Sequence, residues 1–254
     1  MNAYLIARNT FREASRDRLL LGALGAGALL LATTQLLTPL ALGEGVRLTV
    51  DLGLSGISLI GLMLVLLVGT SLVSKEIDRR TIFNLLSRPL ARHTYLIGKW
   101  AGLTATLWIV AFSMGAALAG ILALRGHPEF VPGIAQGTYL AALELAVVTA
   151  CAVLFSAIST PVLSALYTTG LYLVGQWSYD LREFASHFPP AVASACNVAA
   201  NLVPNLPLFN MRTLAANAES APFGHLCVAT VYALMYCGCA LALATAAFET
   251  RDFK

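Results

Sequence analysis

One serine has a neighbourhood that could support nucleophilic chemistry. Ser55 lies in the run Gly53-Leu54-Ser55-Gly56, inside a long apolar stretch. A serine hydroxyl is a weak nucleophile unless a nearby base, most often a histidine, takes its proton. The last apolar stretch, 226–248, contains no histidine, and His225 only borders it. Close helix packing by glycine and serine is therefore favoured over covalent catalysis.

Residue patterns that bind nucleotides or metals are missing from the sequence. Its Gly-Lys pair, Gly98-Lys99, is followed by Trp100 and lacks the first glycine of a phosphate-binding loop. The histidines are scattered, without paired metal-ligand spacing, at His93, His127, His187 and His225. Five cysteines form no C-x-x-C and are typical of small core residues, although pairing of Cys196 with Cys227 outside a membrane stays open. We expect no catalytic residue, metal or cofactor in this chain.

Charged residues are scarce and unevenly placed. The 254-residue chain has 11% charged residues, against roughly a quarter in a typical soluble domain. A run of about 18 or more apolar residues can cross a ~30 Å hydrocarbon core as a helix. The sequence therefore predicts an all-α polytopic membrane protein, a single transmembrane domain over 1–254 with six transmembrane helices at 19–38, 52–74, 100–124, 134–158, 161–179 and 226–248.

Two breaks in the apolar pattern decide where the later spans end. As one helix, the 46 residues 134–179 would be about 69 Å long, so the chain must turn back at Ser159-Thr160-Pro161. Residues 180–225 contain several prolines that would break a spanning helix. We expect this segment to be extracytoplasmic, with short helices or a re-entrant piece at the level of the headgroups. Little chain is left for a globular catalytic domain, so any energy source must be a partner or a gradient.

The N-terminal residues 2–18 have the pattern of an amphipathic interfacial helix. Apolar residues recur along one face, at Tyr4, Ala7, Phe11 and Ala14, and basic residues recur every four positions along another, at Arg8, Arg12 and Arg16. The residues predicted to contact the membrane surface are Arg8, Phe11, Arg12 and Arg16. The alternative is a basic flank of the first span, without a surface helix of its own.

The distribution of Lys and Arg predicts the orientation. With a cytoplasmic N-terminus, 12 of the 16 basic residues lie on the cytoplasmic side, as the positive-inside rule requires. Both termini and the loop 75–99 are then cytoplasmic, and 180–225 is outside. The predicted location is the inner (cytoplasmic) membrane of the cell.

Glu144 is the single charged residue inside the predicted spans. A carboxylate near mid-membrane costs a few kcal/mol even on lenient scales, so it should not face lipid. We expect either a water-filled path at a dimer interface or a polar partner inside the bundle, such as Thr104, Thr106 or Gln176. Whether Glu144 is a packing residue or acts on a cargo path stays open at this point.

The loop after the second predicted span has the most specific pattern: Ser74-Lys75-Glu76, Arg80-Thr81, Leu85-Leu86-Ser87-Arg88-Pro89, Arg92 and Gly98-Lys99. It resembles the cytoplasmic loop of ABC-2-type permeases, most closely the branch associated with multicopper-enzyme maturation and gliding-type exporters. The runs Phe11-Arg12-Glu13 and Arg251-Asp252-Phe253 also resemble the N-terminal helix and the tail of that family.

The resemblance implies a coupling helix between the second and third spans that docks on a separate ATPase. The residues that would make this contact are Lys75, Glu76, Asp78, Arg79, Arg80, Ile82, Phe83 and Leu86. It also implies the membrane subunit of an ATP-driven exporter, not an enzyme, with ATP and Mg²⁺ held by the partner. The expected partners are a cytoplasmic ABC ATPase dimer, a second permease copy or homologue, and membrane lipids, with no nucleic acid. On pattern alone, the loop could also be merely solvated and basic.

Two other classes of protein compete with this interpretation. A gradient-driven transporter or channel usually carries several ionisable groups within its spans, whereas this chain has only Glu144. The run Gly53-Leu54-Ser55-Gly56 resembles the motif of rhomboid-type intramembrane serine proteases, but here it lies on the second span and the last span lacks the required histidine. The sequence does not reveal the substrate.

Overall fold

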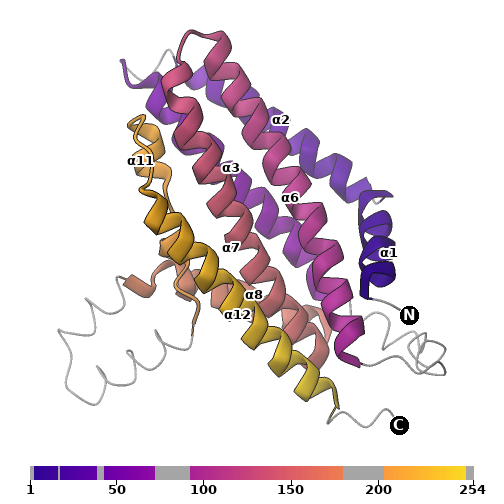
Figure 1. Cartoon of the computed structure of the whole chain (residues 1–254). Coiled ribbons are helices and arrows are strands. Elements are labelled where there is room, and N and C mark those ends of the chain that lie inside the picture. Colours follow the sequence, from indigo (N-terminus) through magenta and orange to yellow (C-terminus); the bar gives the residue numbers. More distant parts are fainter. Residues whose placement is uncertain (1–2, 17, 39–42, 72–91, 180–202, 250–254) are drawn as a thin grey trace.

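The computed structural model of the chain describes residues 3–16, 18–38, 43–71, 92–179 and 203–249. These residues form helices and turns, with no strand among them (Figure 1). The α-helices are α1 (Ala3–Arg16), α2 (Arg18–Leu37), α3 (Gly45–Val68), α6 (Arg92–Leu124), α7 (Val131–Ile158), α8 (Pro161–Gln176), α11 (Arg212–Ala216) and α12 (Phe223–Glu249). Short 3-10 turns occupy η2 (Gly69–Ser71), η3 (Pro128–Phe130) and η4 (Leu206–Phe209).

Four of the described helices are long and apolar enough to cross a membrane: Gly45–Val68, His93–Leu124, Pro128–Ile158 and Phe223–Phe248. The first two helices meet this criterion only as a bent pair, Ala3–Ser15 and Leu20–Leu36, with 59° between them. Helix α8 has 16 residues, or about 24 Å, which is shorter than a ~30 Å hydrocarbon core. The prediction of an all-α membrane protein is confirmed, and the number of six spans stays a prediction.

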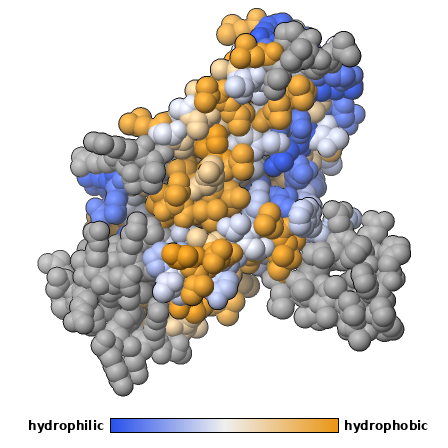
Figure 2. Space-filling model, turned by 180° about the vertical axis from the view of Figure 1, so that it is seen from behind, coloured by the Kyte–Doolittle hydropathy of each residue, from blue (hydrophilic) through white to orange (hydrophobic). Residues whose placement is uncertain are grey.

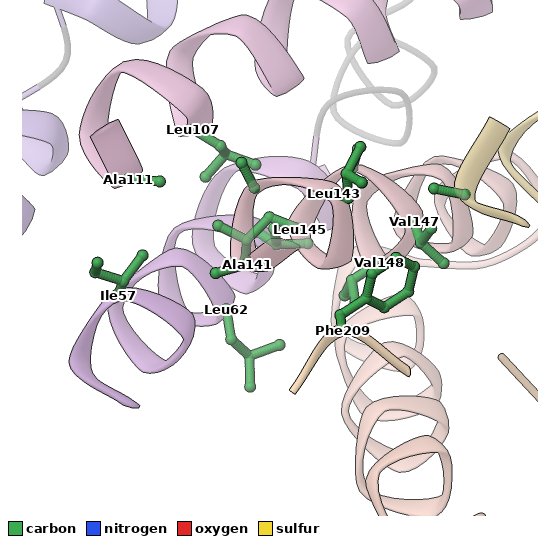
Figure 3. Close-up of a cluster of buried hydrophobic side chains, with 14 of the residues drawn as sticks. Ile57, Leu62, Leu107, Ala111, Ala141, Leu143, Leu145, Val147, Val148 and Phe209 are labelled. Carbon is green, nitrogen blue, oxygen red and sulfur yellow. The ribbon is translucent and has the colours of Figure 1, made fainter. Parts of the chain in front are cut away.

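Helix α7 lies at the centre of the bundle and is apolar all round, as expected of a buried helix. In its most apolar part 83% of the residues are buried, against 28% in α12, which lies at the periphery. Figure 3 shows side chains from α3 and α6 around it, among them Ile57, Leu62 and Leu107. All three are buried. Any polar side chain on α7 must therefore find its partners inside the protein.

Helix α6 runs antiparallel to α7, and two of its tryptophans donate hydrogen bonds to α7. The indole Nε1 of Trp100 donates to the Ala146 carbonyl at 3.1 Å, and Nε1 of Trp108 donates to the Ala142 carbonyl at 2.8 Å. The beginning of α6 and the end of α7 therefore share one end of the bundle. The beginning of α1 and the end of α12 lie toward this same lower end in Figure 1.

Two helices begin seven or eight residues earlier than the predicted spans. Helix α3 begins at Gly45 rather than at 52, so Arg47 and Asp51 lie on the helix. Both are near its first turns, where Arg47 Nη1 pairs with Glu44 Oε2 at 2.9 Å. Helix α6 begins at Arg92 rather than at 100, so Lys99 is helical and 5% exposed. These charged residues had suggested the span boundaries, but both helices continue through them.

Residues 203–216 pack directly against the bundle, and their level in a membrane stays a prediction. A Cβ on Gly175, near the end of α8, would lie 2.9 Å from Leu206 Cδ1, and one on Gly133 of α7 would lie 3.0 Å from Ala215 Cα. Leu206 and Phe209 are almost fully buried. Residues 203–216 thus continue along the bundle beyond the end of α8. Burial of their apolar side chains favours this position. Residues 180–202 lie outside the described part.

Helix α1 packs on the bundle through a face that overlaps the predicted apolar face only at Ala14. Ile6, Thr10 and Ala14, four residues apart, are buried, whereas Tyr4 is 71% exposed. The buried face packs on α6, where a Cβ on Gly102 would lie 2.5 Å from the Ala7 carbonyl oxygen. Contact with a glycine-containing helix, rather than hydrophobicity alone, selects the inward face.

Candidate functional site

The most unusual polar group in the bundle is the carboxylate of Glu144. It lies 13 residues into the 28-residue helix α7, about 20 Å from either end, and is 4% exposed. Ser58 Oγ donates a hydrogen bond to Glu144 Oε2 at 3.1 Å. Gln176 Nε2 donates to Oε1 at 2.6 Å. Both carboxylate oxygens are therefore occupied by neutral donors.

Each partner of Glu144 comes from a different helix. Ser58 lies on α3, and Gln176 is the last residue of α8, so the short α8 ends at the level of the acid. Gln176 Nε2 also donates to the Tyr172 hydroxyl at 3.1 Å. The network joins three helices at one level of the bundle.

Gln176 was one of the three expected partners of Glu144, and the structure confirms this contact. The other two do not join the network. Thr106 donates to the Gly102 carbonyl at 3.0 Å, and Thr104 Oγ1 has no hydrogen-bond partner among the described residues. Ser58 was not predicted, because a serine in an apolar helix usually packs against a neighbour or its own backbone.

Two cavities adjoin the network. A small one reaches Glu144 and is lined by Leu54, Ser58, Gly137, Ala141, Glu144, Phe209, Asn210, Met211 and Arg212. A larger one, of about 460 Å³, lies between α2, α3 and α8 and is lined by Leu30, Thr33, Thr34, Leu52, Ser55, Gly56, Ser58, Leu59, Tyr172 and Arg212. Ser58 and Arg212 line both. Arg212, from the segment predicted to be extracytoplasmic, thus lies close to Glu144.

Ser55, the candidate nucleophile, lines the larger cavity without a histidine beside it among the lining residues. His225, which borders the last apolar stretch, instead has Nε2 at 3.0 Å from the Leu208 carbonyl oxygen. Within the described residues no group of three or more His, Cys, Asp or Glu is arranged to hold a metal ion. Cys227 is exposed on α12, and Cys196 lies outside the described residues.

A second buried ionisable residue, Lys99, lies near the beginning of α6. Lys99 Nζ on α6 is 4.0 Å from Glu13 Oε2 on α1, and 5.9 Å from the centroid of the Tyr95 ring. Tyr95 in turn stacks on Phe248 of α12, with the ring centroids 6.4 Å apart. These contacts bring α1, α6 and α12 together at the end of the bundle where residues 72–91 connect to α6.

The predicted ATPase contact falls outside the described residues. This applies to Lys75, Glu76, Asp78, Arg79, Arg80, Ile82, Phe83 and Leu86. Of the predicted membrane-surface residues, Arg8 and Arg12 are exposed and Phe11 is partly buried, while the side chain of Arg16 is outside the described part. Their contact with a membrane stays a prediction.

A comparison with family models decides the class of the protein. The model described as ABC-2 family transporter protein matches residues 3–253. The chain belongs to the ABC-2 transporter family. This ABC-2 protein is accordingly a multi-pass membrane protein and the permease, or membrane subunit, of an ABC transporter. No curated protein sequence matches the chain.

The match confirms the resemblance found in the loop 74–99 and extends it over nearly the whole ABC-2 chain. The likeness to the multicopper-enzyme-maturation and gliding-type branch stays a prediction. The family consists of transport subunits, which agrees with the prediction that the chain is not an enzyme.

Proposed function

We propose that this chain is the permease subunit of an ATP-driven exporter. It pairs with a second copy or a homologue and couples to a cytoplasmic ABC ATPase dimer, which binds ATP and Mg²⁺. Both termini and the segment 75–99 face the cytoplasm, and the protein resides in the inner membrane. The observation that carries this proposal is the family match over residues 3–253, in a sequence without a phosphate-binding loop of its own.

The packing of α6 supports a mechanical link between an ATPase and the membrane core. Residues 72–91 join the end of α3 to the beginning of α6, which is one continuous 33-residue helix. At its base α6 is held by α1 and α12 through Lys99 and Tyr95. Trp100, which follows Lys99 directly, and Trp108 further along are hydrogen-bonded to α7. A displacement of the segment 72–91 would therefore move α6 together with α1 and reach α7.

Two substitutions in the proposed coupling segment test this function. Glu76→Arg reverses a charge and Phe83→Asp removes an apolar anchor, and loss of an interface anchor costs about 2 kcal/mol or more, roughly 30-fold in affinity. We expect both variants to lose the co-expressed ATPase during purification and to uncouple ATP hydrolysis from transport. Quantitative co-purification from detergent-solubilised membranes measures the effect.

Glu129→Arg is the matched control, because Glu129 is an exposed acid at the opposite end of the bundle. It makes the same charge reversal and should leave ATPase recovery unchanged. Monodisperse elution of all three variants shows that the permease is intact. Undiminished recovery of the ATPase from both coupling-segment variants would refute the proposed function.

A further inference from the structure

The larger cavity is lined by leucines, by residues with hydroxyl groups and by one strongly basic group. Its volume of about 460 Å³ falls within the range of small-molecule sites, and Leu30, Leu52 and Leu59 form much of its wall. Arg212, from α11, lines it as well. The Arg212 guanidinium makes no hydrogen bond or ion pair with any residue in the described part of the chain. Its five N–H donors are therefore available to a bound anion.

Arg212 is partly exposed and lies close to a buried carboxylate. It shares the small cavity with Glu144, which lies near the middle of α7. Charged side chains within a membrane protein's bundle usually pair with one another or line a water-filled path. Glu144 attracts Arg212 electrostatically, but no ion pair within 4.0 Å joins them, and the acid accepts hydrogen bonds from Ser58 and Gln176. Arg212 thus lies between a satisfied carboxylate and the larger cavity.

The surroundings of the cavity indicate what can reach it. The two helices that form much of its wall, α2 and α3, also carry exposed apolar side chains, including Leu29 at 67%, Leu36 at 75% and Met63 at 58% exposure. Figure 2 shows an extended apolar surface across this side of the molecule. In a membrane protein such a surface faces lipid chains. A ligand that enters from this surface must therefore partition into the bilayer.

We propose that this cavity binds an amphiphile with one acyl or alkyl chain and one anionic head group, a carboxylate or a phosphate monoester. The head group lies against Arg212, whose planar fork of donors matches either anion. The chain lies along Leu30, Leu52 and Leu59. As the cargo class of an exporter this assignment rests on the proposed function, whereas binding itself requires no ATPase.

Photolabelling of the full chain in lipid nanodiscs tests the site. The probe is palmitic acid carrying a diazirine in its chain, and the alcohol of the same chain length is the head-group control. Peptide mapping should place the acid's label on the α2 and α3 segments that line the cavity, with at least fivefold less label from the alcohol. Competition with palmitate and with hexadecyl phosphate distinguishes the two anionic head groups.

Substitutions at Arg212 separate charge recognition from general lipid contact. Arg212→Gln should lower labelling of the cavity by about tenfold, since a charge-assisted hydrogen bond is roughly twice as strong as a neutral one. Arg212→Lys should retain most of it. Arg125→Gln is the matched control, because Arg125 is exposed at the end of α6 and lines neither cavity.

A second variant tests the space rather than the charge. Ser55→Phe places a ring in the cavity and should abolish labelling with Arg212 intact, whereas Ser113→Phe, on an exposed face of α6, should not. Equal labelling by acid and alcohol, equal effects of Arg212→Gln and Arg125→Gln, or a label confined to other helices would each overturn the proposal. Specific labelling combined with undiminished ATPase recovery from the Glu76 and Phe83 variants would keep the site and refute the exporter.

Discussion

Glu144 and Lys99 are both buried ionisable residues on long apolar helices, yet their surroundings differ. Glu144 lies at the middle of α7 and is met by neutral donors from α3 and α8. Lys99 lies seven residues after the beginning of α6 and is met by an aromatic ring and by the carboxylate of Glu13, which is 69% exposed. One residue is enclosed by the bundle, and the other lies close to its edge.

The difference follows from how far each group is from water. A long lysine stem can be buried while its ammonium group reaches toward a partner at the boundary. A carboxylate 20 Å from either helix end has no such route, so its hydrogen bonds must come from within the protein. We therefore infer that the network around Glu144 stabilises the fold more than the Lys99 contact does, and that salt affects only the latter.

Glu144→Leu should have the largest effect. The substitution leaves the Ser58 hydroxyl and the Gln176 amide without their acceptor, and each unsatisfied buried donor costs about 1–3 kcal/mol. We expect a loss of at least about 2 kcal/mol, and a fall of roughly 5 °C in the midpoint of thermal unfolding. Tm in a detergent micelle, followed by tryptophan fluorescence, measures it.

Glu144→Gln is the control for shape. Its amide oxygen still accepts the hydrogen bond from Gln176, so most of the stability should return, while the ability to ionise is lost. If transport survives in Glu144→Gln, the residue is structural; if transport stops while ATPase binding and Tm are unchanged, it acts on the cargo path. An unaltered Tm in Glu144→Leu would contradict the comparison with Lys99.

Part of the network around Glu144 could be predicted from the sequence, and the rest could not, for identifiable reasons. Gln176 could be predicted because it is a strongly polar residue at the end of an apolar stretch. Ser58 gave no such signal, since serine occurs widely in membrane helices. Arg212 was counted as an outer residue because prolines surround it, and only the packing of residues 203–216 against α7 and α8 brings it to the cavity.

The N-terminal helix α1 could also be predicted only in part. Its amphipathic pattern was visible, and Arg8 and Arg12 are exposed as expected. The inward face, with Ile6 and Thr10, depends on the glycines of α6, which lie some 90 residues further along the chain. The beginning of α6 was missed because Lys99 suggested a boundary, whereas Glu13 and Tyr95 accommodate its charge on the helix.

Gly102→Val should have the intermediate effect. A Cβ at this position would lie 2.5 Å from the Ala7 carbonyl oxygen and 2.7 Å from Thr10 Cβ, so α1 has to move away from α6. Overpacking of this kind costs about 1–3 kcal/mol. We expect faster hydrogen exchange over residues 3–16, measured by mass spectrometry, and with it a loss of the contact between Glu13 and Lys99.

The matched control for this change lies on the same helix. A Cβ at Gly120 would have nothing within 4 Å, so Gly120→Val should leave exchange in α1 unchanged. Equal protection of residues 3–16 in both variants would show that α1 is held by something other than its contact with Gly102.

The pair Lys99 and Glu13 should show the smallest effect. Their charged atoms are 4.0 Å apart and the carboxylate is largely exposed, so solvent and salt screen the attraction. In a double-mutant cycle with Lys99→Met and Glu13→Gln, we expect a coupling energy below about 1 kcal/mol that falls further between 0.05 and 0.5 M salt. Methionine retains an apolar stem of similar length, so the cycle reports charge rather than packing. Thermal unfolding of the four proteins at both salt concentrations measures the coupling. A value above about 2 kcal/mol that salt leaves unchanged would mean that this pair is as isolated from water as Glu144, and that distance from the helix end does not govern how the two charges are accommodated.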